Sequence, residues 1–367
     1  MANAGMHAEF SISADGMGGS MRETPMPTPP VPEIFSPHQA GSELDRLLAR
    51  LSTGVGETVA YGTHLLLWSA ARSTGRIDEV PLLLLFRHAL ETVDALRCLL
   101  RPGVIEPCKM LLRGLFETVL SCEYILKADE ERRALCFLAG YLHWEVDMAR
   151  RLDAGSTQGR KFRRRLGKDK ILHGLKLPEG QALRIREEQL EKLLRDPGLA
   201  EVEAEYHAQK QRTNRTPIWY SMYGGPRNLE TLAAQVELPG LYDFLYRRWS
   251  ASVHGLEVFE GKLQGRDGTR YITQLRSLDN IQPVTQHTLW LVIQLFQGYV
   301  HNRLPDMERE LEDWFGREML PLYEELARGP ILQIESVFHD ESRAQQRRDD
   351  AQGSRVASTR QPQAGRC

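Results

Sequence analysis

The chain has 367 residues, of which 41% are hydrophobic, so it is long enough to bury the core of one large or two ordinary domains. Its formal net charge of −2 and pI near 6.6 exclude a protein that binds nucleic acid or an anionic membrane through its global charge, which leaves only a local patch for such binding. No apolar run is long enough for a transmembrane helix or a signal peptide, which predicts a cytoplasmic protein without membrane association.

The cysteines and the motif content argue against metals and cofactors. No CxxC pair occurs among the five cysteines, and no HExxH or Gly-rich phosphate loop is present. We therefore predict a reduced protein with no metal and no cofactor. The cysteines are Cys98, Cys108, Cys122, Cys136 and Cys367.

Both ends of the chain are predicted to be disordered. Residues 1–40 are rich in Pro, Gly, Ser and Met, and residues 339–367 are rich in Arg, Gln, Asp and Ser. Such segments cannot bury enough apolar surface to offset the entropy lost on ordering.

Four amphipathic helices are predicted between residues 42 and 152. The first begins after Ser42 and runs to about Arg72, although glycines in its interior weaken the expectation of an unbroken helix. Apolar spacing and breakers such as Arg101-Pro-Gly place the others at about 78–101, 107–127 and 130–152. On the third of these helices Arg113 and Glu117 form an i,i+4 pair among leucines, which predicts a half-buried structural ion pair or a pair that orients a functional group on another helix.

The composition changes after residue 155. Basic residues dominate the stretch from Gly155 to Lys170, with Asp169 as the only acid. This is the one local patch that could contact phosphates, and the alternative is a solvated linker between helices. The candidate nucleic-acid-binding residues are Arg160, Lys161, Arg163, Arg164 and Arg165.

Two polar helices follow at 179–195 and 199–210, then an aromatic, turn-rich segment and a short helix from Pro226 to Glu237. Beyond Gly255, about 25 residues lack a helical period, although residues 269–275 have the composition of a short strand. A loop of this length predicts a lid over a neighbouring site. Two further helices are expected, one starting at Pro283 and one from about Pro305 to Arg328.

These elements predict an all-α multi-helix bundle. It should form a single domain over residues 41–338, with a polar and basic excursion at about 155–215.

The segment Leu241–Gly255, LYDFLYRRWSASVHG, is the best candidate for a functional site. On an ideal helix, Tyr246, Ser250 and His254 are successive i+4 neighbours, and Arg247 lies within about 20° of the same face. One helix would thus present a hydroxyl, an imidazole and a guanidinium together.

The sequences RGLFE (113–117) and YRRWSASVH (246–254) resemble those of a bacterial family of all-helical proteins known only as a domain of unknown function. The resemblance extends over roughly residues 45–305 without the basic excursion. It implies a fold and a motif but no activity.

The second motif also resembles that of the HEPN group, helical bundles of which many are metal-independent ribonucleases with an Arg-x(4–6)-His motif. Arg247 and Arg248 precede His254 by six and five intervening residues, so both fit the motif. The resemblance implies RNA as substrate, a role in a bacterial defence or toxin system, and a site at the interface of a homodimer.

The chemistry of such a nuclease needs an acid or base near neutral pH and a cation for the charge on phosphorus. His254 suits the first role, and Arg247 is favoured over Arg248 for the second because Arg248 points about 120° away from His254 on an ideal helix. Tyr246 and Ser250 would then orient the imidazole or a phosphate oxygen.

Two alternatives to the nuclease remain open. His254 precedes Gly255, so it can be an ordinary residue at a helix C-terminus. The protein can also be a non-enzymatic helical module that binds a partner or neutralises a toxin through its Tyr and Arg face.

Overall fold

The computed structural model describes residues 40–175, 181–256, 262–266, 269–272, 274–329 and 331. Apart from Ala40, the two segments predicted to be disordered lie outside the described residues.

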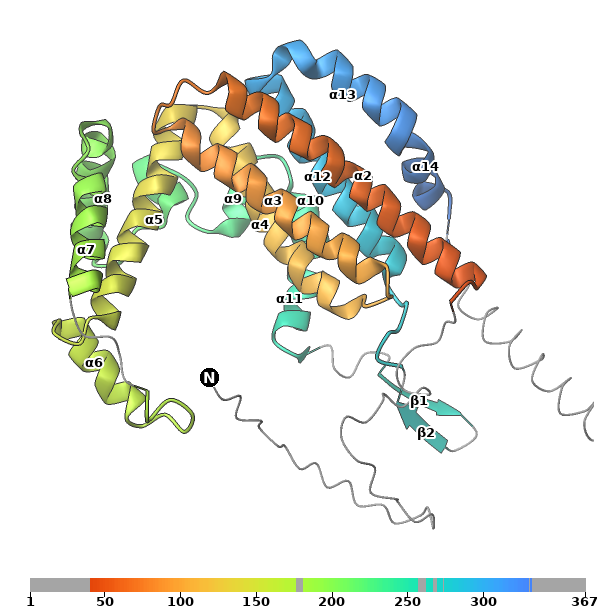
Figure 1. Ribbon diagram of the computed structural model, residues 1–367, viewed down its shortest axis with the longest axis horizontal. Helices are drawn as coiled ribbons and strands as arrows, with labels where there is room; N and C mark the ends of the chain where they lie inside the picture. Colours follow the sequence, from red (N-terminus) through yellow and green to blue (C-terminus); the bar gives the residue numbers. More distant parts are fainter. Residues whose placement is uncertain are drawn as a thin grey trace, which may run out of the picture.

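The main bundle is built from four long helices. They are α2 (Glu43–Arg72), α3 (Glu79–Leu100), α4 (Glu106–Lys127) and α12 (Ile281–Arg303). Consecutive helices pack against each other, and α12 closes the bundle by contacting both α4 and α2 (Figure 1). The Ser42 side chain caps α2 by accepting a hydrogen bond from the backbone N–H of Asp45 at 3.1 Å. The first three helices thus follow the predicted ranges closely.

The glycines of α2 serve helix packing and leave the helix unbroken. A Cβ atom at Gly62 would lie 2.4 Å from Leu90 Cδ2 and 2.8 Å from Phe296 Cζ. A Cβ atom at Gly54 would lie 2.2 Å from Leu322 Cδ2. The glycines therefore permit close approach of other helices, which outweighs their low intrinsic helix propensity.

Helix α12 lies at the centre of the bundle. It begins at Ile281, two residues before the predicted start, and its buried residues lie on several sides of the helix rather than along one stripe. The predicted last helix is divided into a 3₁₀ turn (Pro305–Met307), α13 (Glu308–Trp314), a π segment (Phe315–Met319) and α14 (Leu320–Arg328). Trp314 stacks on Tyr61 of α2 with ring centroids 4.1 Å apart, which joins this helical segment to the bundle.

An arm extends from the main bundle along α5 (Glu130–Leu152), as Figure 1 shows. It contains α6 (Thr157–Leu166), α7 (Gln181–Leu194), α8 (Ala200–Thr213) and two short 3₁₀ turns, Pro197–Leu199 and Trp219–Gly224. The arm has a hydrophobic core separate from that of the bundle. Its buried members are Leu135, Cys136, Ala139, Leu142, Val146, Leu190, Leu199, Val202, Tyr206 and Met222.

The chain returns to the bundle through α9 (Leu229–Gln235), α10 (Pro239–Leu241), a π segment (Tyr242–Arg247) and α11 (Arg248–Val253). An antiparallel hairpin of β1 (Leu263–Arg266) and β2 (Thr269–Ile272) follows. Strand β2 falls within the predicted strand, whereas β1 was not expected. The described residues therefore form the predicted helical fold with one small hairpin, and the single-domain boundaries at 41 and 338 stay a prediction.

None of the helices described here is both long and apolar enough to cross a membrane.

Candidate functional site

The segment from Pro239 to Val253 is not one regular α-helix. Residues Tyr242–Arg247 form a π segment, in which each turn holds an extra residue. Buried Leu245 and Trp249 anchor the segment in the bundle core, and α11 packs against α4. The π segment ends at Arg247, so the stretch from Arg247 to His254 runs through the regular helix α11, and the predicted common face of these two residues stays a prediction.

Helix α4 and this segment meet in a polar network. Arg113 Nη2 donates a hydrogen bond to the Tyr246 hydroxyl at 2.7 Å, and its guanidinium lies 4.6 Å from the centre of the tyrosine ring. Arg113 Nε lies 3.4 Å from Glu117 Oε1, so the predicted ion pair is present. Tyr242 stacks on Tyr246 with ring centroids 5.2 Å apart. Burial is the main cause that raises the pKa of Tyr246, so this phenol stays protonated and serves as a neutral hydrogen-bonding partner.

Ser250 forms its hydrogen bond within the same helical segment. Its Oγ donates to the Tyr246 backbone carbonyl at 2.6 Å. This is the ordinary i−4 contact of a helical serine. The structure therefore brings Arg113, Glu117, Tyr246 and Ser250 together as one connected group.

Arg247, Arg248 and His254 lie outside that group at the surface. Arg247 Nη2 donates to Glu230 Oε1 at 2.8 Å, and its Nε lies 3.0 Å from Asp243 Oδ1. Its guanidinium also lies 5.4 Å from the ring centre of Tyr242. Two carboxylates thus neutralise the cation that the motif assigned to a phosphate.

His254 is the residue at which α11 ends. It has φ −94° and ψ 5°, and Gly255 follows with φ +68°, the left-handed conformation expected just after a helix. This matches the alternative in which His254 occupies an ordinary helix end. Within the described residues, no hydrogen bond or ion pair joins His254 or Arg248 to another side chain, and both are exposed.

The basic segment differs from the predicted linker because residues 157–166 form helix α6. Ser156 caps the helix by accepting a hydrogen bond from the Gly159 backbone N–H at 2.8 Å. Gly159 and Leu166 are buried and Phe162 is half-buried, so one face of α6 packs inward. The many basic residues of this segment made its apolar face hard to recognise in the sequence.

The cations of α6 point mainly to solvent. Arg160 donates to the Gly155 carbonyl at 2.7 Å and to Thr157 Oγ1 at 3.1 Å, and Arg163 also has a partner. The remaining basic side chains, Lys161, Arg164, Arg165, Lys168 and Lys170, are exposed. Asp169, the one acid of the segment, accepts backbone N–H groups of Ile171 and Leu172 at 2.9 and 2.8 Å, and these hydrogen bonds lower its pKa.

The β1–β2 hairpin follows the candidate segment along the chain, and the residue before β1 contacts the start of α4. Lys262 Nζ lies 2.8 Å from Glu106 Oε2, which ties the entry of β1 to the first turn of α4. The lid interpretation stays a prediction, and residues 257–261, 267, 268 and 273 lie outside the described residues.

A further group of side chains was missed by the sequence analysis. His143 of α5 meets Glu203 and His207 of α8, and one ligand atom from each lies within 4.8 Å of the others. Glu203 and His207 have i,i+4 spacing, which was a local signal, but their approach to His143 depends on the tertiary packing of α5 on α8.

One protein-family model matches the part of the chain that contains most of these residues. A model described as a family of unknown function (DUF5677) matches residues 79–269, which is more than half of the chain. The chain belongs to this family. The DUF5677 match includes the motifs that carried the resemblance and also the basic segment, which the resemblance was expected to omit.

No curated protein and no solved structure matches the chain. The description of DUF5677 assigns no activity.

Proposed function

We propose that the protein is a helical module that binds single-stranded RNA without cleaving it, with α6 as the element that contacts phosphates. The observation that carries this proposal is the exposed cationic face of α6. Lys161, Arg164, Arg165 and Lys168 recur at spacings of three and four residues, so they lie on one side of the helix and its final turn.

The packing of α6 supports this role. Its apolar face packs against α5, so the cations are held on an ordered helix rather than on a flexible linker. Prior ordering lowers the entropy lost when a polyanion binds. Neutralised phosphates release counterions, which makes such binding strong at low salt.

Exposed aromatic side chains on α5 favour a single strand over a duplex. Tyr141 and Trp144 are 46% and 57% exposed, and their ring centroids lie 6.4 Å apart. Arg151 is exposed two turns further along, toward α6. Aromatic rings beside a basic surface are the arrangement on which unpaired bases stack.

The proposal is tested by the binding of a labelled single-stranded RNA, measured by fluorescence anisotropy over a range of salt concentrations. Arg164→Ala and Arg165→Ala should each weaken binding and reduce the slope of log K against log[salt] by about 0.7 per lost phosphate contact. Trp144→Ala should cost about 1–3 kcal/mol of binding energy with the salt slope retained. Arg309→Ala, at an exposed cation of α13, is the matched control.

Wild-type protein that shows no salt-dependent binding at low ionic strength would overturn the proposal. Equal affinities of the wild type and both α6 variants would remove α6 from it. A single-stranded DNA of the same sequence tests whether the 2′-hydroxyl contributes.

A metal-independent ribonuclease is the second candidate. The observation that favours it is that Arg248 and His254 are both exposed and unpaired among the described side chains, whereas Arg247 is paired with Glu230 and Asp243. His254 would move a proton to or from the 2′-hydroxyl or the leaving oxygen, and Arg248 would stabilise the charge on phosphorus.

This second candidate predicts cleavage of RNA in the presence of a chelator. His254→Ala should reduce the rate by about 100-fold or more, Arg248→Ala should also reduce it, and Arg247→Ala should have little effect. The same residual cleavage by all four proteins would eliminate the nuclease. The associated homodimer is tested by light scattering across protein concentrations, and a monomer at all of them would contradict it.

A further inference from the structure

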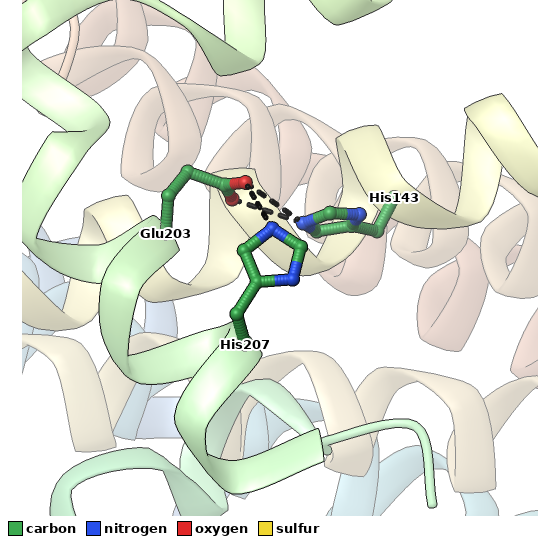
Figure 2. A group of neighbouring side chains, drawn as sticks. All are labelled: His143, Glu203 and His207. Atoms are coloured by element: carbon green, nitrogen blue, oxygen red, sulfur yellow. Dashed lines mark hydrogen bonds and ion pairs between the residues drawn. The ribbon is translucent and has the colours of Figure 1, made fainter. Parts of the chain in front are cut away.

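Two helices of the arm direct three metal-ligand side chains at one point. Figure 2 shows His143 of α5 facing Glu203 and His207, which lie one turn apart on α8. His143 Nε2 lies 3.0 and 3.1 Å from the two carboxylate oxygens of Glu203. His207 Nε2 lies 3.6 Å from Glu203 Oε2.

These spacings match the edges of a metal coordination shell. Zinc binds imidazole nitrogen and carboxylate oxygen at about 2.0–2.2 Å, so neighbouring ligands of a tetrahedral ion lie about 3.3–3.5 Å apart. The spacings of 3.0–3.6 Å around Glu203 bracket that value. A small shift of side chains, without movement of either helix, would therefore admit an ion.

The packing of the arm orients the ligands in advance. The Tyr206 ring stacks on the His143 ring with centroids 3.7 Å apart and an interplanar angle of 5°. Tyr206 is buried in the core of the arm, so it fixes the plane of the imidazole. Glu203 and His207 are held by their i,i+4 placement on α8.

The site is partly open to solvent. His143 and Glu203 are 17% and 15% exposed, whereas His207 is 59% exposed. Asp147, one turn after His143 on α5, lies close enough for its charge to act on Tyr206. Lys210 Nζ lies 5.8 Å from the centre of the Tyr206 ring, so an acid and a base flank the ligands, and solvent reaches the site from the side of His207.

We propose that His143, Glu203 and His207 bind one divalent transition-metal ion of the zinc class, with water in the remaining position. Two imidazoles and one carboxylate suit Zn²⁺ and Co²⁺ better than the hard cations Mg²⁺ and Ca²⁺, which prefer oxygen ligands. Three protein ligands with one open position is the arrangement of an exchangeable or catalytic ion rather than of a closed structural site.

The ion would join α5 to α8 and stabilise the arm. In its absence the hydrogen-bonding contact between His143 Nε2 and the Glu203 carboxylate joins the two helices. Metal binding replaces this contact, because the imidazole nitrogen binds a metal only in its unprotonated form.

The test uses the full chain, stripped with a chelator and dialysed, and titrated with Zn²⁺ in a calorimeter. We expect one ion per chain. His207→Ala should weaken Zn²⁺ binding by at least about 100-fold. Even the loss of a residue that only hydrogen-bonds to a metal ligand commonly weakens binding 10- to 100-fold. Because His207 is the most exposed ligand, this variant should keep the fold. Titration with Co²⁺ should give the intense visible bands of a four- or five-coordinate ion.

His88→Ala is the matched control. His88 and Glu91 form an exposed pair on α3, with Nδ1 3.9 Å from Oε2. Among the described residues no third metal-ligand side chain joins this pair, so the variant should bind Zn²⁺ like the wild type. Glu203→Gln keeps the size and hydrogen-bonding capacity of the side chain, and it should weaken binding as His207→Ala does. Absence of saturable Zn²⁺ uptake by the wild type would overturn the proposal, as would wild-type affinity in both ligand variants with circular dichroism showing them folded.

Discussion

The main bundle and the arm each place a glutamate and a histidine among packed helices, with opposite results. In the bundle, Glu123 of α4 and His287 of α12 are not paired with each other, and burial raises the pKa of Glu123 to about 7 and lowers that of His287 to about 4. In the arm, Glu203 and His143 face each other within hydrogen-bonding distance. Burial thus favours the neutral forms of Glu123 and His287, which are separate, whereas Glu203 and His143 gain a hydrogen-bonding partner in each other.

The environment of His287 explains its loss of charge. Three aromatic rings, those of Phe244, Trp249 and Trp290, lie with their centroids 5.1–5.5 Å from the imidazole centroid. Its Nδ1 is buried with no hydrogen-bond partner in the described structure, and the positive charge of Arg248 further disfavours a proton. Desolvation is the larger cause.

Glu123 is less completely enclosed. Gln294 Nε2 donates to its Oε1 at 3.4 Å, and the nearby charge of Lys127 also favours the carboxylate, but neither offsets burial. The carboxylate occupies space that Gly298 leaves free, since a Cβ atom there would lie 2.7 Å from Oε1.

The largest expected effect concerns His287. Its pKa in the folded protein, about 4, lies below the usual value near 6.5, so the unfolded chain binds more protons between these pH values. Its contribution to stability is therefore present above pH 6.5 and is lost as the pH falls to 4, by about 3 kcal/mol. Urea unfolding at several pH values should show this dependence removed in His287→Phe. Equal pH dependence in wild type and variant would contradict a dry, neutral His287.

Glu123 should give the opposite slope. The pKa of Glu123 in the folded protein, about 7, exceeds its usual value of 4.5, so the folded protein holds the extra proton. Its contribution is present below pH 4.5 and is lost as the pH rises through 7, by about 2 kcal/mol because the group is only partly buried. Glu123→Gln should thus stabilise the protein at neutral pH and leave it unchanged at pH 4.

The two groups offset each other in the wild type between pH 4.5 and 6.5, so the variants are needed to separate them. A Glu123→Gln protein that is less stable than the wild type at pH 7 would show that its carboxylate is paired, as in the arm.

The network at Arg113 is a paired group inside the main bundle and gives a smaller effect. Tyr246→Phe removes the hydroxyl that accepts from Arg113 and keeps the stacked ring, at a cost of about 1 kcal/mol. A double-mutant cycle with Arg113→Met, measured by urea unfolding, should give a coupling energy of about 1 kcal/mol. Additive effects of the two substitutions would mean that the hydrogen bond contributes nothing to stability.

Local periodicity in the sequence predicted the long helices and the pairs that lie within one helix. The helices α2 to α5, α7 and α8 and the Arg113–Glu117 pair were found in this way, because each depends on neighbours three or four residues away. The π segment at Tyr242–Arg247 changes the helical spacing ahead of α11 without any residue type that marks it, so the sequence did not predict it.

The meeting of α5 with α8 could not be predicted in the same way. His143 is 60 residues from Glu203, and only the packing of α5 against α8 brings the two together. Helix α6 was missed for a different reason. Its basic residues suggested solvation, while its inward face is marked only by Gly159, Phe162 and Leu166.

The smallest expected effect is that of the arm pair when metal is absent. Glu203→Gln, in chelator, can keep a hydrogen bond to His143 and loses only a partly exposed charge, so it should destabilise the arm by about 0.5 kcal/mol. Hydrogen exchange of the α8 amides measures this locally, with α12 as the internal reference. A cost of several kcal/mol, or faster exchange in both helices, would mean that the pair is as tightly built into the fold as a buried group of the bundle. If the pair is arranged to bind an ion, the cost should be small and confined to α8. The pair then contributes little stability by itself, and a bound ion adds to that stability.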